Sequence, residues 1–247
     1  MKKLAILVSI SALAGAANAA VVLHSQGSII NGTNGGNNVS LITAPNSSFG
    51  FNCSVAGSFR VADDFVAGAG WKMESVTMHA FQGGTPGGFT MPTINVQVLK
   101  GASINTATVV FDGSNLATLN PTFEAYRAAA TTPSNQTRPV YKFDVDVTDM
   151  MLENGATYWV SWSIDGTAAS GSGPWTPQVM NGAAFLQGNA VQNVAGGTYN
   201  PLVSAISGGT AGITAPFEIN GSVVPEPATM IALGAGIAAV AARRRRK

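Results

Sequence analysis

The sequence predicts an all-β fold, an antiparallel two-sheet sandwich of jelly-roll-like character. Apolar and polar residues alternate over several short runs, as expected for strands with one face in a core. Glycine-rich clusters at 82–88 and 170–175 separate some of these runs and are typical of turns. We expect a signal peptide before this domain and a short C-terminal hydrophobic helix after it, which gives segments 1–19, 20–222 and 223–247.

Six runs carry the period-two pattern and are the expected strands: 59–65, 76–81, 94–98, 141–147, 158–164 and 217–223. The clearest is 141–147, in which aromatic residues and valines alternate with a lysine and two aspartates. Residues 121–130 instead suggest a helix, because Pro121 suits an N-terminal turn and Glu124 follows in that turn. The asparagine- and glycine-rich stretch 27–48 is expected to form irregular loops.

The N-terminus has the features of a secretory signal peptide. Two lysines at positions 2 and 3 precede an apolar run from Leu4 to Leu13. Ala17 and Ala19 then form the small-x-small pattern of a signal-peptidase site, so Ala20 is the expected first residue of the mature chain. The site has no following cysteine, which argues against a lipoprotein signal. The expected partners at this end are the Sec machinery and signal peptidase.

The C-terminus combines a short motif, an apolar segment and a basic cluster. The motif is Val224, Pro225, Glu226 and Pro227, and the apolar segment runs from Ala228 to Ala242. These 15 residues fall short of the roughly 20 that span a bilayer core. The basic cluster consists of Arg243, Arg244, Arg245, Arg246 and Lys247. Because positive residues stay in the cytoplasm, the chain between the two ends is expected to lie on the far side of the inner membrane, outside the cytoplasm.

In order, spacing and position, this tail resembles the PEP-CTERM protein-sorting signal of Gram-negative bacteria. The resemblance implies a partner enzyme, exosortase, a membrane cysteine transpeptidase that processes the chain near Pro-Glu-Pro. It also implies a transient stay at the inner membrane before the cell surface or the extracellular space, whereas an ordinary single-pass anchor is the alternative. Five short internal runs look like landmarks of exported β-sandwich domains carried ahead of such tails: 61–65, 70–71, 75–77, 157–162 and 172–175.

The charge of the exported domain argues against nucleic-acid binding. Seven of the 13 basic residues lie in the two terminal segments, which leaves six basic against 11 acidic residues and a net charge of about −5. A nucleic-acid-binding face would need a basic stripe. The single cysteine, Cys53, cannot form an internal disulfide and has no neighbouring basic residue to stabilise a thiolate, so we expect it to be inert.

Motifs for catalysis are missing from the sequence. It has no glycine-rich phosphate loop, no paired-cysteine metal site and no His-Glu-x-x-His. His24 and His79 are the only bases available to a catalytic triad. We expect His79 to be a packed or surface residue and His24 to lie too near the mature N-terminus to be held in place. The expected protein is therefore not an enzyme and has no cofactor.

Two acidic residues were considered as metal ligands. Asp144 and Asp146 share one strand face, about 6.6 Å apart along the strand. Calcium takes six to eight oxygen ligands, so another loop, with Asp63 or Asp64, would have to complete a structural calcium site. A solvated strand face is the simpler interpretation. Glycoside hydrolysis needs two carboxylates across a cleft, and nothing in the sequence places two acids in that way.

The tryptophans give the best ligand hypothesis. Trp159 is expected to face away from Trp162, and Trp175 lies in a glycine-proline loop, so an indole could stack on the apolar face of a sugar. Core packing is the competing interpretation of both side chains. The sequence thus favours a non-enzymatic protein of the cell surface or extracellular polysaccharide matrix. A carbohydrate-binding module is the second hypothesis, and a polysaccharide hydrolase or lyase is the third.

Overall fold

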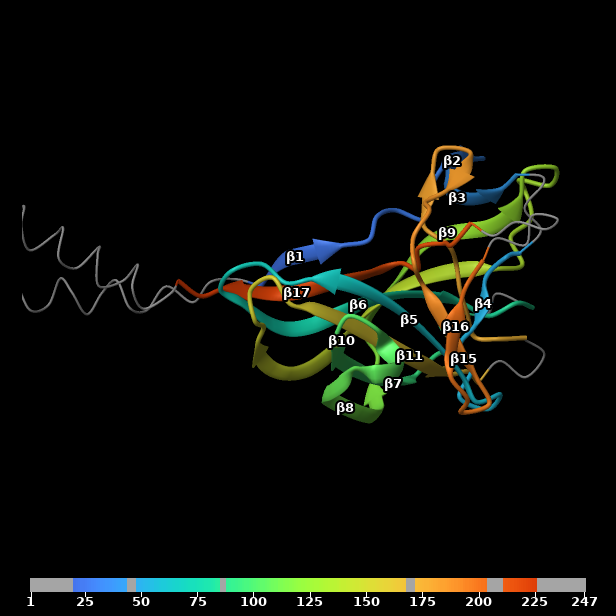
Figure 1. The fold of residues 1–247 in the computed structure, drawn as a ribbon. Helices are drawn as coiled ribbons and strands as arrows, with labels where there is room; N and C mark the ends of the chain where they lie inside the picture. Colours follow the sequence, from blue (N-terminus) through green and yellow to red (C-terminus); the bar gives the residue numbers. More distant parts are fainter. Residues whose placement is uncertain (1–19, 44–47, 85–87, 168–171, 204–210, 226–247) are drawn as a thin grey trace, which may run out of the picture.

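A computed structural model describes residues 20–43, 48–84, 88–167, 172–203 and 211–225 (Figure 1). The predicted signal peptide, the apolar tail segment and the basic cluster lie outside the described residues, as do Glu226 and Pro227. Within the described ranges no helix is long and apolar enough to cross a membrane. Ala20 and Pro225 are the first and last residues described.

Two sheets form the sandwich. The strands of the first, in spatial order, are β1 (Val21–Ser25), β17 (Phe217–Val223), β6 (Trp71–Phe81), β10 (Pro139–Met151), β9 (Leu119–Ala129), β3 (Asn37–Ile42) and β2 (Gly32–Asn34). Those of the second are β16 (Tyr199–Pro201), β15 (Val191–Val194), β5 (Phe59–Val66), β11 (Thr157–Asp165), β7 (Thr93–Lys100) and β8 (Thr108–Ala117). Smaller elements are β4 (Phe51–Asn52), β12 (Trp175–Thr176), β13 (Met180–Asn181), β14 (Ala184–Phe185) and the 3₁₀ turn η1 (Ile104–Thr106). The predicted two-sheet antiparallel sandwich is confirmed.

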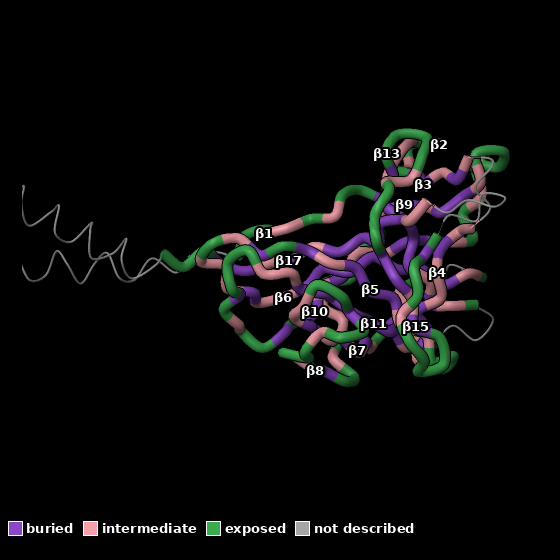
Figure 2. The backbone as a smooth tube through the Cα atoms, viewed as in Figure 1, coloured by how far each residue is buried: buried purple, intermediate pink, exposed green. Residues whose placement is uncertain are grey.

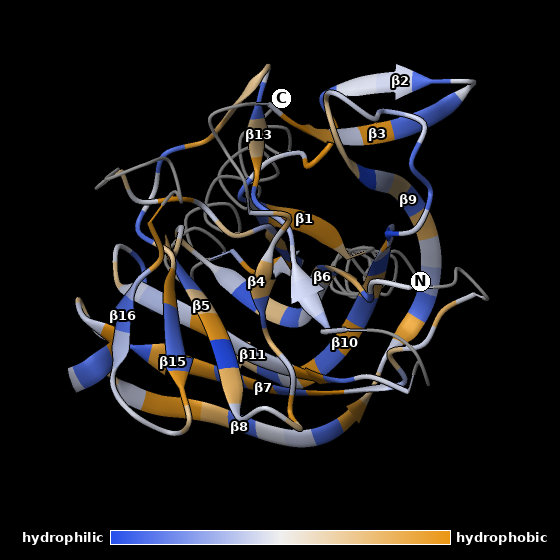
Figure 3. Ribbon diagram, turned by 90° about the vertical axis from the view of Figure 1, so that its right-hand side faces the viewer, coloured by the Kyte–Doolittle hydropathy of each residue, from blue (hydrophilic) through white to orange (hydrophobic). Residues whose placement is uncertain are grey.

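The hydrophobic core lies between the two sheets (Figure 2). The first sheet contributes Met78 and Phe143, and the second contributes Val160 and Trp162, each no more than 1% exposed. Successive side chains of a strand point to opposite faces, which places these residues on the inner face. Figure 3 shows apolar and polar residues interspersed along β5. Each large side chain buried in this way contributes about 1.5–3 kcal/mol to folding.

The two ends of the described chain lie together at one end of the sandwich (Figure 1). β1 pairs antiparallel with β17, with Val21 opposite Gly221. β17 also pairs with β6, so the last strand lies between two others. Beyond it, the Val224 amide donates to the Gly70 carbonyl over 2.7 Å. The last described strand therefore ends at Val223, directly before the Val-Pro-Glu-Pro motif.

Two expectations for the first sheet were wrong. Residues 121–130 were expected to be helical but lie almost wholly in β9, which pairs antiparallel with β10 and parallel with β3. Those ladders satisfy the backbone on both sides and bury Ala125 and Ala128, which outweighs the helix-start signals of Pro121 and Glu124. Residues 27–48 were expected to be irregular but contain β2 and β3, because β3 completes the parallel pairing along β9.

Candidate ligand-binding surface

The two tryptophans proposed as sugar contacts are placed differently by the fold. Trp159 is 5% exposed, and its indole Nε1 donates to the Gly101 carbonyl over 3.0 Å. It packs with Leu99 and Val191 on the outer side of the second sheet, opposite Trp162 as expected. Trp175 is half-buried in β12 and packs against the cluster around Phe81. Trp159 therefore presents no open ring face to a ligand.

The aspartates considered for calcium lie on the outer face of β10. Asp144 accepts hydrogen bonds from Thr77 Oγ1 at 2.6 Å and from Asn120 Nδ2 at 3.4 Å. Asp146 is exposed, whereas Asp63 is buried on β5 of the other sheet. Among the residues that the structure describes, no three His, Cys, Asp or Glu side chains are grouped so as to hold a metal. The pair thus has no third ligand of this kind within the described chain.

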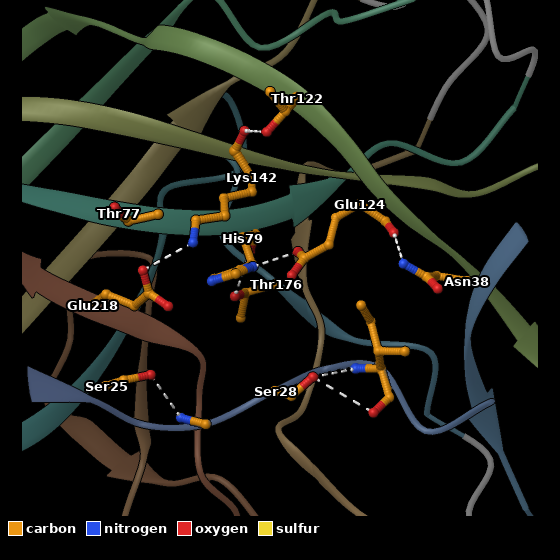
Figure 4. Close-up of polar contacts among 12 residues, drawn as sticks. Ser25, Ser28, Asn38, Thr77, His79, Thr122, Glu124, Lys142, Thr176 and Glu218 are labelled. Atoms are coloured by element: carbon orange, nitrogen blue, oxygen red, sulfur yellow. Dashed lines mark hydrogen bonds and ion pairs between the residues drawn. The ribbon is translucent and has the colours of Figure 1, made fainter. Parts of the chain in front are cut away.

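Both histidines are held by packing. His79 is 3% exposed, and its Nδ1 lies 2.6 Å from Glu124 Oε2 (Figure 4). His24 is half-buried on β1 against the rings of Phe65 and Phe217, and burial lowers its pKa while Asp64 opposes that shift. The Nε2 atoms of both histidines have no hydrogen-bond partner within the described ranges. Neither imidazole is thus paired with a hydroxyl or thiol there, as nucleophilic catalysis would require. The expectation that His24 would be poorly held was wrong, because β1 is anchored to β17.

Charged residues on the outer face of the first sheet are paired with one another. Lys142 Nζ lies 2.9 Å from Glu218 Oε2, which joins β10 to β17 (Figure 4). Further along, Lys72 Nζ lies 2.5 Å from Asp149 Oδ2 and 3.3 Å from Glu74 Oε1. Partly exposed pairs of this kind contribute little to stability. The outer face of the first sheet is therefore polar here, and its positive and negative side chains neutralise one another.

Cys53 is buried in the core and its thiol donates to the Pro174 carbonyl over 3.4 Å. Burial raises the pKa of this thiol far above its usual range. The thiolate, which is the nucleophile and the metal ligand, is therefore not formed at neutral pH. This environment agrees with the expectation of an inert cysteine.

Four aromatic rings gather on one side of β9 and β10, and we call them the aromatic surface: Phe89, Phe123, Tyr126 and Tyr141. The ring centroids of Phe123 and Tyr126 are 4.7 Å apart, and those of Phe123 and Tyr141 are 6.3 Å apart. Phe89 meets Tyr141 edge-on at 5.3 Å. Phe123 is 43% exposed, so part of this surface is open to solvent.

A β-bulge creates the aromatic surface. Residues three apart on a regular strand point to opposite faces, which would separate Phe123 from Tyr126. The register between β9 and β10 shifts here: Ala125 lies opposite Val140 and Phe123 opposite Tyr141, so β9 has one extra residue, Glu124. A bulge of this kind re-aims side chains. A helix over residues 121–130, as expected from the sequence, would not have formed this cluster.

The hydroxyls of Tyr126 and Tyr141 make no hydrogen bond within the described part of the chain. The other two tyrosines differ, because Tyr158 Oη accepts from the Glu153 amide and Tyr199 Oη bonds Ser161 Oγ at 2.6 Å. Partial burial and the nearby Tyr126 raise the pKa of the Tyr141 phenol, so it stays protonated at neutral pH. Exposed ring area beside free hydroxyls suits a ligand with an apolar face and polar edges.

The described chain is an all-β sandwich, and its C-terminal segment matches a known family model. Residues 223–246 match the model of the PEP-CTERM protein-sorting motif. The chain therefore carries the PEP-CTERM sorting signal, and the resemblance of its tail to that signal is confirmed. The signal indicates export with a membrane-associated sorting step by exosortase-type machinery. Among curated proteins no relative matches the chain.

Proposed function

We propose that this protein is a non-enzymatic β-sandwich of the cell surface or extracellular matrix of a Gram-negative bacterium. Sec exports it, signal peptidase cuts before Ala20, and an exosortase-type transpeptidase processes it near Pro225 and Glu226. The observation that carries this proposal is the sorting motif at 223–246, which starts at the end of β17. β1 lies beside β17, so both targeting segments connect to the same end of the sandwich and can reach one membrane together.

The described side chains support a role without catalysis. His24 is held in ring packing, the His79 ring is hydrogen-bonded to Glu124, Cys53 is a buried thiol, and Asp144 is bonded to neutral side chains. A hydrolase or lyase would need two carboxylates facing each other across a substrate cleft. Loss of polysaccharide turnover on changing a pair of acidic residues would favour that third hypothesis.

Replacing Pro225, Glu226 and Pro227 with three alanines tests the sorting step. The apolar segment and arginines stay intact, so a sorting substrate should remain in the inner membrane uncut, whereas a simple anchor should behave as wild type. Intact mass and membrane fractionation distinguish the two. Val66→Ala at the exposed end of β5, outside the sorting motif, is the control and should be processed normally. Wild-type protein that keeps Arg243 to Lys247 permanently in the inner membrane would refute the proposal.

A carbohydrate-binding module is the second candidate function, and the aromatic surface favours it. Phe123 offers an exposed ring, and Tyr126 and Tyr141 offer hydroxyls that are free within the described chain. We expect Phe123→Ala to weaken binding to a glycan roughly fivefold, since one aromatic contact is worth on the order of 1 kcal/mol.

Glycan-array binding followed by calorimetry measures this loss. Val109→Ala is the control, because Val109 is an exposed apolar residue of β8 in the other sheet. Wild-type protein that binds no glycan, or equal affinity in wild type and Phe123→Ala, would remove the aromatic surface as a sugar site.

A further inference from the structure

Arg127 is a buried cation with no counter-charge among the residues that the structure describes. It lies on β9, is 1% exposed, and is among the largest fully buried side chains. None of the ion pairs in the described part of the chain includes it. Burying a charge without a partner of opposite sign is unfavourable. Burial lowers the pKa of its guanidinium to about 9, which leaves the group protonated at neutral pH.

Neutral groups accept hydrogen bonds from only some of the N–H donors of this guanidinium. Nε donates to the Phe49 carbonyl at 2.8 Å, and Nη1 donates to Ser40 Oγ at 2.6 Å. Nη2 donates to Gln178 Oε1, and Nη1 also meets the thioether of Met180 at 3.5 Å. A guanidinium has five N–H donors, and sulfur is a weak acceptor. Of the five, three therefore have oxygen acceptors, one has a sulfur, and one has no acceptor within the described chain.

A recess lies beside this group. Its lining includes Arg127, Gln178, Met180, Ser48 and Phe185, and its empty volume is ≈ 190 Å³. That volume includes solvent at the mouth of the recess, and the enclosed part has room for about one water-sized particle, so the recess can take a single small ion but not a sugar or a peptide carboxylate. A second cation lies near Phe49, whose carbonyl accepts from Arg127: the Arg138 guanidinium is 3.9 Å from the Phe49 ring centroid.

We infer that the recess beside Arg127 binds a small monovalent anion of about the size of chloride. The anion accepts the N–H that has no partner among the described residues and replaces the weak contact to Met180, which gives the guanidinium a counter-charge. It also joins elements far apart in sequence, since Ser40, Phe49, Arg127 and Gln178 surround the guanidinium. This inference does not depend on sorting or on sugar binding.

Thermal unfolding of the full-length chain in mild detergent tests the site. Sodium chloride is titrated against sodium gluconate at constant ionic strength, since gluconate is too large for the recess. A ligand that binds only the folded state raises the unfolding midpoint as its concentration exceeds Kd. We expect the midpoint of the wild type to rise with chloride and that of Arg127→Met to stay flat. Arg60→Gln removes a partly exposed arginine that bonds Ser161 and should respond as the wild type does.

Gln178→Glu keeps the inference testable if Arg127→Met does not fold. It places a carboxylate on the Arg127 guanidinium at nearly constant volume, so the chloride response should disappear while the fold is kept. Crystals grown with sodium bromide should show an anomalous peak within hydrogen-bond distance of Arg127. The assignment would be overturned by a wild-type midpoint that does not respond to chloride, or by equal responses in wild type and Gln178→Glu. It would also be overturned by a midpoint that rises with sodium acetate in place of chloride but not with chloride, or by a bromide map without that peak.

Discussion

At the scale of single residues, the sandwich also buries a carboxylate that does not pair with the buried arginine. Asp63 on β5 is 1% exposed. Its Oδ2 accepts from the Ala215 amide and its Oδ1 from the Asp64 amide, each at 2.9 Å. No ion pair within the described ranges includes Asp63. Burial raises the pKa of this carboxyl to about 7, which outweighs the two amide donors that favour the charged form.

This burial predicts a pH-dependent stability. Between its ordinary pKa of 3.8 and about 7, Asp63 binds a proton in the folded chain that the unfolded chain lacks, so its contribution to stability falls as pH rises through that window. The full effect is at most about 4 kcal/mol. Urea unfolding of wild type and Asp63→Asn from pH 4 to pH 8 measures it. The wild type should lose stability relative to the variant as pH rises.

The difference between the two proteins isolates Asp63 from other titrating groups. His24 acts in the opposite direction, because its lowered pKa makes the folded chain release a proton first as pH rises. Both proteins contain His24, so its contribution cancels in the difference. Asp146→Asn, at an exposed position of β10, keeps Asp63 and is the control: its stability should fall with rising pH as that of the wild type does. If the unfolding free energies of the wild type and Asp63→Asn change in parallel with pH over this range, Asp63 is not buried as described.

At the scale of elements, the sequence predicted the long strands that have one buried face. The six period-two runs correspond to β5, β6, β7, β10, β11 and β17. This works because alternate residues of such strands meet the core and solvent in turn, as along Tyr141–Val147. β8 was missed because most of its residues are exposed on both faces. Elements of two to four residues, such as β4 and β13, are too short to show a period.

The surfaces of β9 could not be predicted in the same way. Its helix-like start depends on local signals, while its strand state depends on ladders to β10 and to β3, about 85 residues earlier in the chain. The bulge at Glu124 that joins Phe123 to Tyr126 has no local signature. The burial of Arg127 could not be predicted from the sequence either, because arginine is almost never fully buried unless it is paired. The two candidate sites thus follow from tertiary pairing, whereas the sorting motif follows from residue order alone.

At the scale of the whole molecule, the fold and the sorting signal meet at one point. β17 is an internal strand between β1 and β6, and Phe217 and Ile219 fill the core with at most 1% exposure. The Val224 amide then bonds the Gly70 carbonyl. Pro225 follows, and proline lacks the N–H that a further ladder bond would need. The sandwich is therefore complete before the segment that the sorting machinery acts on.

This arrangement predicts that the exported domain folds without its tail. A chain of residues 20–224 should be soluble and unfold cooperatively in urea, because every described strand and the bond to Gly70 are kept. A matched chain that ends at Pro216 should not fold, since it loses β17 and with it two buried side chains worth about 1.5–3 kcal/mol each, together with the ladders to β1 and β6. That loss is comparable to a typical total stability of about 5–15 kcal/mol. Circular dichroism during urea titration measures both, and an insoluble or non-cooperative 20–224 chain would mean that the tail stabilises the fold.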